Sequence, residues 1–132
     1  MPYDFEVSAL VAASPEAIYR AWMSSDEHSA MTGGEAHVNP VVGGEFTAWD
    51  QYIKGTTLEL DPFGRIVQSW RTKHFTDGDP DSQIEVLLEP RGDQTLVRIV
   101  HTNVPDEDRG YEEGGWKDNY LDPMREYFAT RN

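Results

Sequence analysis

The chain contains no cysteine among its 132 residues. This absence excludes disulfide bonds, thiolate metal sites, iron–sulfur clusters and cysteine nucleophiles. Only four histidines are present, and no two of them stand two or four residues apart. The ligand spacings that zinc sites use are therefore missing as well, and we predict neither a metal nor a cofactor. A thiol-free chain is also typical of the cytoplasm, where we expect this protein to act.

Basic residues are scarce, with 11 lysines and arginines against 24 aspartates and glutamates and a net charge of −13. A field of this sign repels nucleic acids and anionic membrane surfaces, so we expect neither as a partner. Long apolar runs are also missing, and no segment is long enough to span a bilayer. Residues 1–10 do not carry a basic stretch followed by an apolar one, so we expect no signal peptide.

Motifs for calcium, phosphate and acyl-transfer sites are absent or incomplete. Asp77, Asp79 and Asp81 have the spacing that opens a calcium loop, but its sixth position is Ser82 and its twelfth is Leu88. No glycine pair lies in a phosphate-binding pattern, and no serine lies in a Gly-x-Ser-x-Gly elbow. We therefore interpret the aspartate segment as a solvated loop and the glycine pairs as tight turns or sites of close packing.

Hydrophobic periodicity predicts one α+β domain, residues 1–132, because the length suits a single core. Residues 3–12 alternate between apolar and polar, which is typical of a half-buried strand. Ser14 followed by Pro15 predicts the start of a helix, and a second short helix is predicted over 25–31. The spacing of turns then predicts an antiparallel meander of about six strands, five of which we place at 45–50, 53–60, 65–75, 82–89 and 94–103.

A long C-terminal helix is predicted over 108–130 and completes the order β-α-α-β(~6)-α. Aromatic and apolar side chains recur at helical spacing on one of its faces, namely Trp116, Tyr120, Met124, Tyr127 and Phe128. Pro123 removes a backbone donor from this helix, so we expect a kink about one turn before it.

Five segments carry a resemblance to a known family. They read SPEAIYRAW (14–22), VGGEF (42–46), IVQSWR (66–71), HTNVP (101–105) and GWKDNYLDPM (115–124). In this order and spacing they resemble the activators of heat-shock-protein-90 ATPase homologues, within the START-like (SRPBCC, Bet v-like) superfamily. The resemblance extends from about Phe5 to Phe128, and Asn103 departs from it at a position where we expect glycine.

The resemblance implies a helix-grip fold, in which a curved antiparallel sheet wraps around the long C-terminal helix and two short helices close one end. It also implies a cavity between sheet and helix that holds an apolar ligand in many relatives. Eukaryotic co-chaperones of the family carry an additional N-terminal chaperone-binding domain, and we expect this chain to be too short to include one.

The cavity candidates come from the implied fold and from strand and helix periodicity. Arg98 is expected to face outward, so Val97, Ile99 and His101 are expected to face the cavity. His101 is either a ligand-binding or basic group there, or a core histidine that is hydrogen-bonded to a neighbouring strand or to the helix. With the helix aromatics and one strand tryptophan, the predicted ligand-binding residues are Val97, Ile99, His101, Trp116, Tyr120, Met124, Tyr127 and Trp70.

Three functions remain open on this evidence. The first is a binding module for a small apolar or amphiphilic ligand, and the second is an interaction protein that modulates a chaperone ATPase. The third is a cyclase- or dehydratase-like enzyme, with His101 and Tyr120 or Tyr127 as acid–base candidates, although we assign no catalytic residue. Either a monomer or a homodimer is compatible with the sequence.

Overall fold

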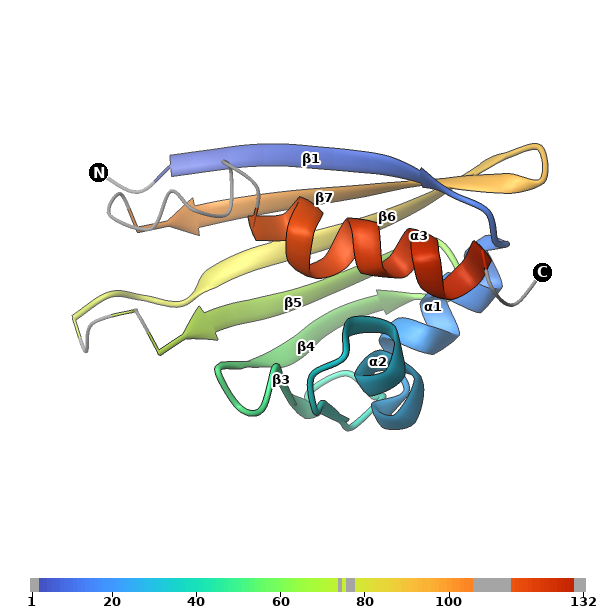
Figure 1. The fold of residues 1–132 in the computed structure, drawn as a ribbon. Coiled ribbons are helices and arrows are strands. Elements are labelled where there is room, and N and C mark those ends of the chain that lie inside the picture. Colours follow the sequence, from blue (N-terminus) through green and yellow to red (C-terminus); the bar gives the residue numbers. More distant parts are fainter. Residues whose placement is uncertain (1–2, 74, 76–77, 106–114, 130–132) are drawn as a thin grey trace.

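A computed structural model describes residues 3–73, 75, 78–105 and 115–129 of the chain. Its elements follow the predicted order of one strand, two short helices, six strands and a final helix (Figure 1). They are β1 (Tyr3–Val11), α1 (Pro15–Trp22), α2 (Ser25–Thr32), β2 (His37–Val38), β3 (Glu45–Ala48), β4 (Ile53–Asp61), β5 (Arg65–Thr72), β6 (Ser82–Arg91), β7 (Gln94–Val104), the π-helical turn η2 (Lys117–Leu121) and α3 (Asp122–Ala129).

The strands form one antiparallel sheet in the order β1-β7-β6-β5-β4-β3-β2. Strands β2 to β7 pair as a meander, and the first strand joins the far edge by pairing with the last. Helix α3 lies across one face of this sheet, with α1 and α2 at one end (Figure 1). The predicted α+β helix-grip fold is therefore confirmed.

Local capping signals mark the start of α1, as predicted, and the end of α2. The Ser14 hydroxyl accepts a hydrogen bond from the Ala17 backbone N–H at 3.2 Å, and Pro15 occupies the first helical turn. Helix α2 ends at Gly33, whose φ of 88° lies in the left-handed region that glycine adopts without steric cost. The Ser14 cap sets the start of α1, whose Ile18 and Trp22 are buried in the core.

Strand β3 is shorter than predicted and ends at Ala48 instead of residue 50. Three consecutive residues, Trp49, Asp50 and Gln51, have φ values of 51°, 58° and 73°. Side chains with a Cβ disfavour this region, and it does not continue a strand. The turn therefore reverses the chain into β4 and redirects the Trp49 side chain. Asn103, where the resemblance predicts glycine, also adopts a positive φ of 58°.

The final helix is irregular where Pro123 predicts a kink. The five residues before α3 form the π-helical turn η2, and the Asp122 backbone N–H donates to the Lys117 carbonyl. A π-helical turn is one of the usual causes of a helix bend. The start of the predicted helix, 108–114, and its last residue, 130, lie outside the described residues. Within the described ranges, no helix has both the length and the apolar composition to cross a membrane.

Candidate functional site

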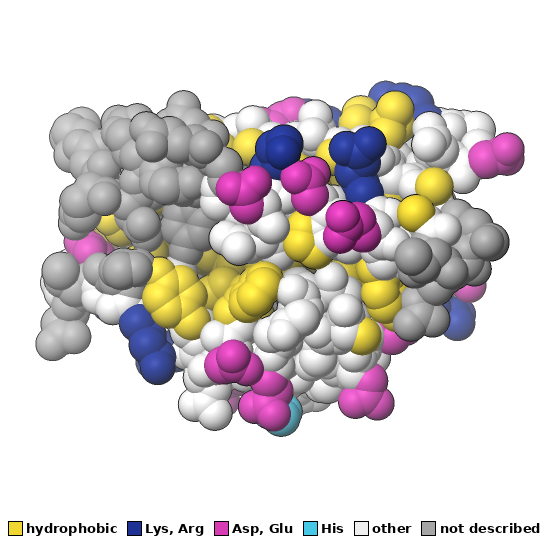
Figure 2. Space-filling view, in the orientation of Figure 1, with side chains coloured by type: hydrophobic (Ala, Val, Ile, Leu, Met, Phe, Trp, Pro, Cys, Tyr) yellow, Lys and Arg dark blue, Asp and Glu magenta, His cyan; other side chains and the backbone are white. Residues whose placement is uncertain are grey.

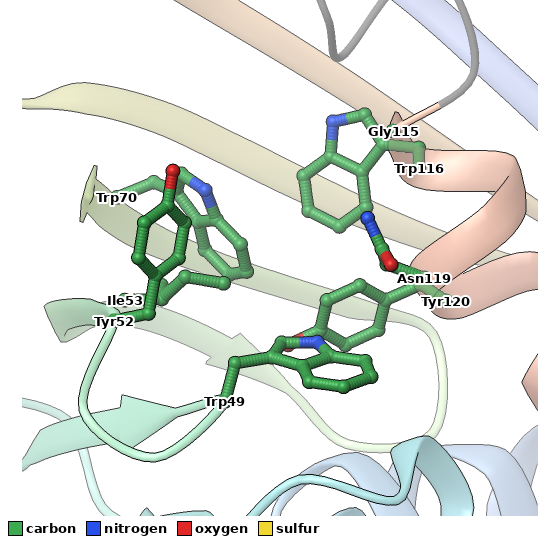
Figure 3. A pocket seen from close by; sticks show the side chains of 8 residues that line it. All are labelled: Trp49, Tyr52, Ile53, Trp70, Gly115, Trp116, Asn119 and Tyr120. Carbon is green, nitrogen blue, oxygen red and sulfur yellow. The ribbon is translucent and has the colours of Figure 1, made fainter. Parts of the chain in front are cut away.

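A cavity of about 310 Å³ lies between the sheet and the helical segment that leads into α3. Five of the eight described lining residues are tryptophan or tyrosine, and none of these eight has a charged side chain (Figure 3). The volume is at the lower end of the range found for small-molecule sites. The lining residues are Trp49, Tyr52, Ile53, Trp70, Gly115, Trp116, Asn119 and Tyr120.

Three of these rings form a continuous wall. Trp70 comes from β5, whereas Trp116 and Tyr120 stand four residues apart on the helical segment, so that both rings meet the sheet. The Trp70 and Trp116 ring centroids are 4.9 Å apart, those of Trp116 and Tyr120 are 5.2 Å apart, and those of Trp70 and Tyr120 are 5.9 Å apart. These distances are typical of aromatic pairs that contribute beyond their buried area.

Trp49 reaches the cavity from the loop between β3 and β4, together with Tyr52 (Figure 3). Its ring packs so closely on Gly34 that a Cβ added to Gly34 would lie 2.6 Å from Trp49 Cε3. The Trp49 indole nitrogen is buried and has no hydrogen-bond partner within the described part of the chain. A buried donor without a partner costs about 1–3 kcal/mol, so a ligand acceptor at this nitrogen would be favourable.

The polar edge of Trp116 is anchored behind the wall by His101. The Trp116 Nε1–H donates to His101 Nδ1 at 3.1 Å, which places the imidazole proton on Nε2. That nitrogen lies 2.8 Å from Ser82 Oγ, and the Ser82 hydroxyl donates to the Trp70 carbonyl at 2.7 Å. Burial lowers the pKa of His101 to about 3, so the ring is neutral and its acceptor nitrogen is preserved.

The polar edge of Tyr120 is anchored in the same way by a second buried histidine. The Tyr120 hydroxyl donates to His28 Nε2 at 3.0 Å, and His28 Nδ1–H donates to the Trp22 carbonyl at 2.9 Å. Burial also lowers the pKa of His28. Since neither histidine lines the cavity, the hydrogen-bonded edges of Trp116 and Tyr120 are engaged outside it. A ligand would meet mainly ring faces.

The structure brings three of the predicted site residues to the cavity and leaves five away from it. Trp70, Trp116 and Tyr120 line the cavity. His101 lies behind Trp116 in the hydrogen-bonded position that was the alternative to a ligand contact. The others do not line the cavity: Val97, Ile99 and Met124 are fully buried in the core, and the half-buried Tyr127 donates to Glu27 Oε1 at 3.1 Å.

Sequence reasoning missed five lining residues, namely Trp49, Tyr52, Ile53, Gly115 and Asn119. Gly115 and Asn119 stand four residues apart, as Trp116 and Tyr120 do, so helical spacing could have placed them on a neighbouring stripe of the same helix. The loop tryptophan was not available from strand alternation, because the positive φ values at 49–51 interrupt it.

A family model described as "Activator of Hsp90 ATPase homolog 1-like protein" matches residues 12–129. The chain belongs to this family. The match includes every described residue of the cavity, so the site is part of the family domain. The family and the START-like fold predicted from the five sequence segments are thus confirmed.

Individual relatives agree with this assignment. An activator of 90 kDa heat shock protein ATPase homolog from Dictyostelium discoideum is 30% identical over 117 residues, and the human homolog 1 is 26% identical over 126 residues. The matches cover 88% of this chain but only 30% and 34% of those proteins, so the chain spans about a third of their length. The crystal structure of an Hsp90 activator from Plasmodium falciparum superposes with a TM-score of 0.81 at 22% identity, covering 91% of each chain.

Proposed function

We propose that this domain binds a small apolar or amphiphilic ligand in the aromatic cavity. The observation that carries the proposal is the cavity itself, whose described lining is mainly tryptophan and tyrosine rings, with the buried and unpartnered Trp49 indole N–H among its lining residues. Ring faces favour a flat, apolar body, and a single buried donor favours one acceptor atom on that body. The absence of charged side chains from the described lining fits a body without charge of its own.

The magnitude of such binding is set by the apolar area that the rings cover. At about 25 cal/mol per Å², burying about 200 Å² of ligand surface contributes about 5 kcal/mol before the cost of association. A two-ring aromatic body meets this requirement. A hydrogen bond from Trp49 adds about 1 kcal/mol and fixes the orientation of the ligand.

Calorimetric titration with 4-(1-naphthyl)butan-1-ol tests the proposal. We expect saturable 1:1 binding to the wild-type protein and loss of binding to Asn119→Trp, because the added indole occupies the cavity from its exposed rim. The exposed Asp118→Asn, one residue away on the same turn, is the matched control and is expected to bind like the wild type. Absence of saturable binding to the folded wild-type protein, or equal binding by Asn119→Trp, would contradict the proposal.

A second candidate function is modulation of an Hsp90-type chaperone ATPase. It is favoured by the family match over residues 12–129 and by the curated relatives named as activator homologs. An ATPase assay of the chaperone with and without this protein tests it. A stimulation that saturates with added protein supports the function, and an unchanged rate at saturating concentrations rejects it.

A further inference from the structure

A groove of about 370 Å³ borders strands β3, β4 and β5 on the outer face of the sheet. In the sheet register Thr47 pairs with Lys54, and Lys54 pairs with Arg71, so these three side chains form one row across the strands. Strand alternation points Trp70, the neighbour of Arg71, to the opposite face, where it lines the aromatic cavity. Figure 2 shows the molecule from the side of that opposite face, on which hydrophobic side chains gather beside α3. The groove is therefore a different site from the aromatic cavity, although Tyr52 at the turn before β4 borders both.

The groove collects cations that lack a counter-charge. Its eight described lining residues include Lys54, Arg71 and Lys73 but no carboxylate, in a chain whose net charge is −13. Within the described part of the chain, neither lysine forms an ion pair or a hydrogen bond from its ammonium group. Arg125 on α3 is the one other lysine or arginine of that part without an ion pair. The described lysines and arginines that do pair with carboxylates are Arg20, Arg65, Arg71, Arg91, Arg98 and Lys117.

Two cations of the groove repel each other across the strands. Lys54 and Arg71 stand directly opposite one another, and like charges in this arrangement destabilise a sheet. Arg71 is held by Asp81, which directly precedes β6, at 3.1 Å, so part of its charge is balanced. Glu45 lies on the same face as Lys54 by strand alternation, but within the described ranges no ion pair joins the two. A negative charge from a binding partner would therefore stabilise this row.

We propose that the groove binds an acidic segment of a partner protein whose carboxylates stand at alternate residues. The Lys73 backbone N–H donates to the Tyr52 carbonyl at 3.1 Å, which continues the pairing of β4 with β5 beyond Thr72. Lys73 is therefore the diagonal neighbour of Lys54, at about 7–8 Å. In an extended segment, the side chains of alternate residues point to the same face and are about 6.6 Å apart. Two such carboxylates can each meet one ammonium group.

Local charge, more than net charge, decides which anion suits this groove. At physiological ionic strength, charges farther away than about 8 Å are largely screened. A short acidic segment therefore meets mainly Lys54 and Lys73, whereas a long polyanion such as a nucleic acid extends over the acidic remainder of the surface. An ammonium group pairs with a carboxylate without fixed geometry, and Thr47 at the end of the row adds a hydroxyl donor. The inference goes beyond the proposed function and does not depend on the aromatic cavity.

Three blocked pentapeptides that differ in the number and spacing of their carboxylates test the inference. They are acetyl-Thr-Glu-Thr-Glu-Thr-amide with alternating carboxylates, acetyl-Thr-Glu-Glu-Thr-Thr-amide with adjacent ones, and acetyl-Thr-Gln-Thr-Gln-Thr-amide with none. A ¹⁵N–¹H NMR titration at low salt measures these affinities and identifies the backbone signals that move. We expect the alternating peptide to bind about tenfold more tightly than the glutamine peptide and about threefold more tightly than the adjacent one. The largest shifts are expected at Thr47, Lys54 and Lys73.

The double variant Lys54→Gln/Lys73→Gln assigns the binding to the groove. We expect it to bind the alternating peptide about tenfold more weakly than the wild type. Lys117→Gln/Arg125→Gln is the matched control, because it removes the same two positive charges from exposed positions on the helical segment, and it should stay within about twofold of the wild type.

Three results would overturn the inference. They are equal affinity of the wild type for the alternating and glutamine peptides, equal affinity for the alternating and adjacent peptides, and equal losses in the two double variants. Neither double variant changes a described residue of the aromatic cavity, so both are expected to bind 4-(1-naphthyl)butan-1-ol like the wild type. A failure of the groove inference is thereby distinguished from a failure of the cavity proposal.

Discussion

The space between sheet and helix has two ends that are filled in different ways. In β5 the inward side chains change from Ile66 to Trp70, and on the helix they change from Met124 to Trp116. The aliphatic end, defined by Ile18, Ile66, Val97, Ile99 and Met124, is fully buried. The aromatic end, defined by the cavity residues, encloses about 310 Å³.

The same core therefore fills the space at its aliphatic end and keeps a cavity open at its aromatic end. Branched aliphatic side chains interdigitate until no space is left. Large rings whose polar edges are tied to His101 and His28 cannot turn inward to fill a hollow without breaking those hydrogen bonds. Stability is therefore expected to depend most on the aliphatic end, and ligand affinity on the aromatic end.

The largest effect is expected at the aliphatic end. Replacing Ile99 by alanine removes fully buried methyl groups and leaves a void, so the free energy of unfolding should fall by about 2–5 kcal/mol. The affinity of Ile99→Ala for 4-(1-naphthyl)butan-1-ol should stay within about twofold of the wild-type affinity. Urea denaturation and calorimetric titration measure the two quantities, with the exposed Val42→Ala as the stability control. A clear loss of affinity for 4-(1-naphthyl)butan-1-ol in Ile99→Ala would contradict the division between a stabilising aliphatic end and a ligand-binding aromatic end.

A smaller loss of stability is expected at the aromatic end. Trp116→Phe keeps a ring but removes the donor to His101, which leaves the buried Nδ1 without that partner. We expect Trp116→Phe to lower the free energy of unfolding by about 1–3 kcal/mol and to bind 4-(1-naphthyl)butan-1-ol more weakly than the wild type. Denaturation and titration of the same sample give both values. Unchanged affinity for this alcohol in Trp116→Phe would place the ligand elsewhere.

The buried histidines should make stability depend on pH. Burial lowers the pKa of His101 from its ordinary 6.5 to about 3 and also lowers that of His28. Below pH 6.5 the unfolded chain binds a proton at His101 that the folded chain does not accept until about pH 3. The free energy of unfolding should therefore fall as the pH decreases through this window, by at most about 1.4 kcal/mol per pH unit for each buried histidine.

Denaturation midpoints measured between pH 7 and pH 4 test this pH dependence in His101→Gln and in the exposed His37→Gln. We expect a shallower slope for His101→Gln and the wild-type slope for His37→Gln. Identical slopes in all three proteins would show that the His101 imidazole is not held neutral by the fold.

The smallest effect on stability is expected for Trp49→Phe. This change removes a buried indole N–H that has no partner in the described structure, which is favourable, and part of the ring that packs on Gly34, which is unfavourable. Because the two effects oppose each other, the free energy of unfolding should change by less than about 0.5 kcal/mol. The affinity for 4-(1-naphthyl)butan-1-ol should nevertheless fall about fivefold, because the hydroxyl loses its donor. Calorimetric titration checks the affinity, with Trp116→Phe as the variant in which both quantities change. A stability loss similar to that of Trp116→Phe would mean that the Trp49 donor is satisfied in the free protein.

The sequence was informative where local rules decide the structure. The Ser14 cap, the Gly33 helix end, the strand alternation of β7 and the irregular turn before Pro123 all follow from spacing and backbone chemistry. The family segments supplied the topology, which local rules do not determine. Element order and most strand positions were therefore predictable.

The cavity was only partly predictable, because tertiary contacts decide which inward side chains border it. Val97 and Ile99 face inward as alternation requires, yet the aliphatic packing covers them. Trp49 enters the site through three consecutive residues of positive φ and close contact with Gly34. Neither feature has a periodic signature in the sequence.

The most direct test of the division between the two ends uses the four tryptophan indole N–H signals in a ¹⁵N–¹H NMR titration with 4-(1-naphthyl)butan-1-ol. Trp49, Trp70 and Trp116 line the cavity, whereas the Trp22 indole donates to Gln68 Oε1 at 3.0 Å and does not line it. Assignment by single tryptophan-to-phenylalanine variants identifies each signal. We predict the largest shift for Trp49, which gains a hydrogen-bond acceptor, and the smallest for Trp22. A saturating titration in which Trp22 shifts most, or in which no indole signal moves, would contradict the account.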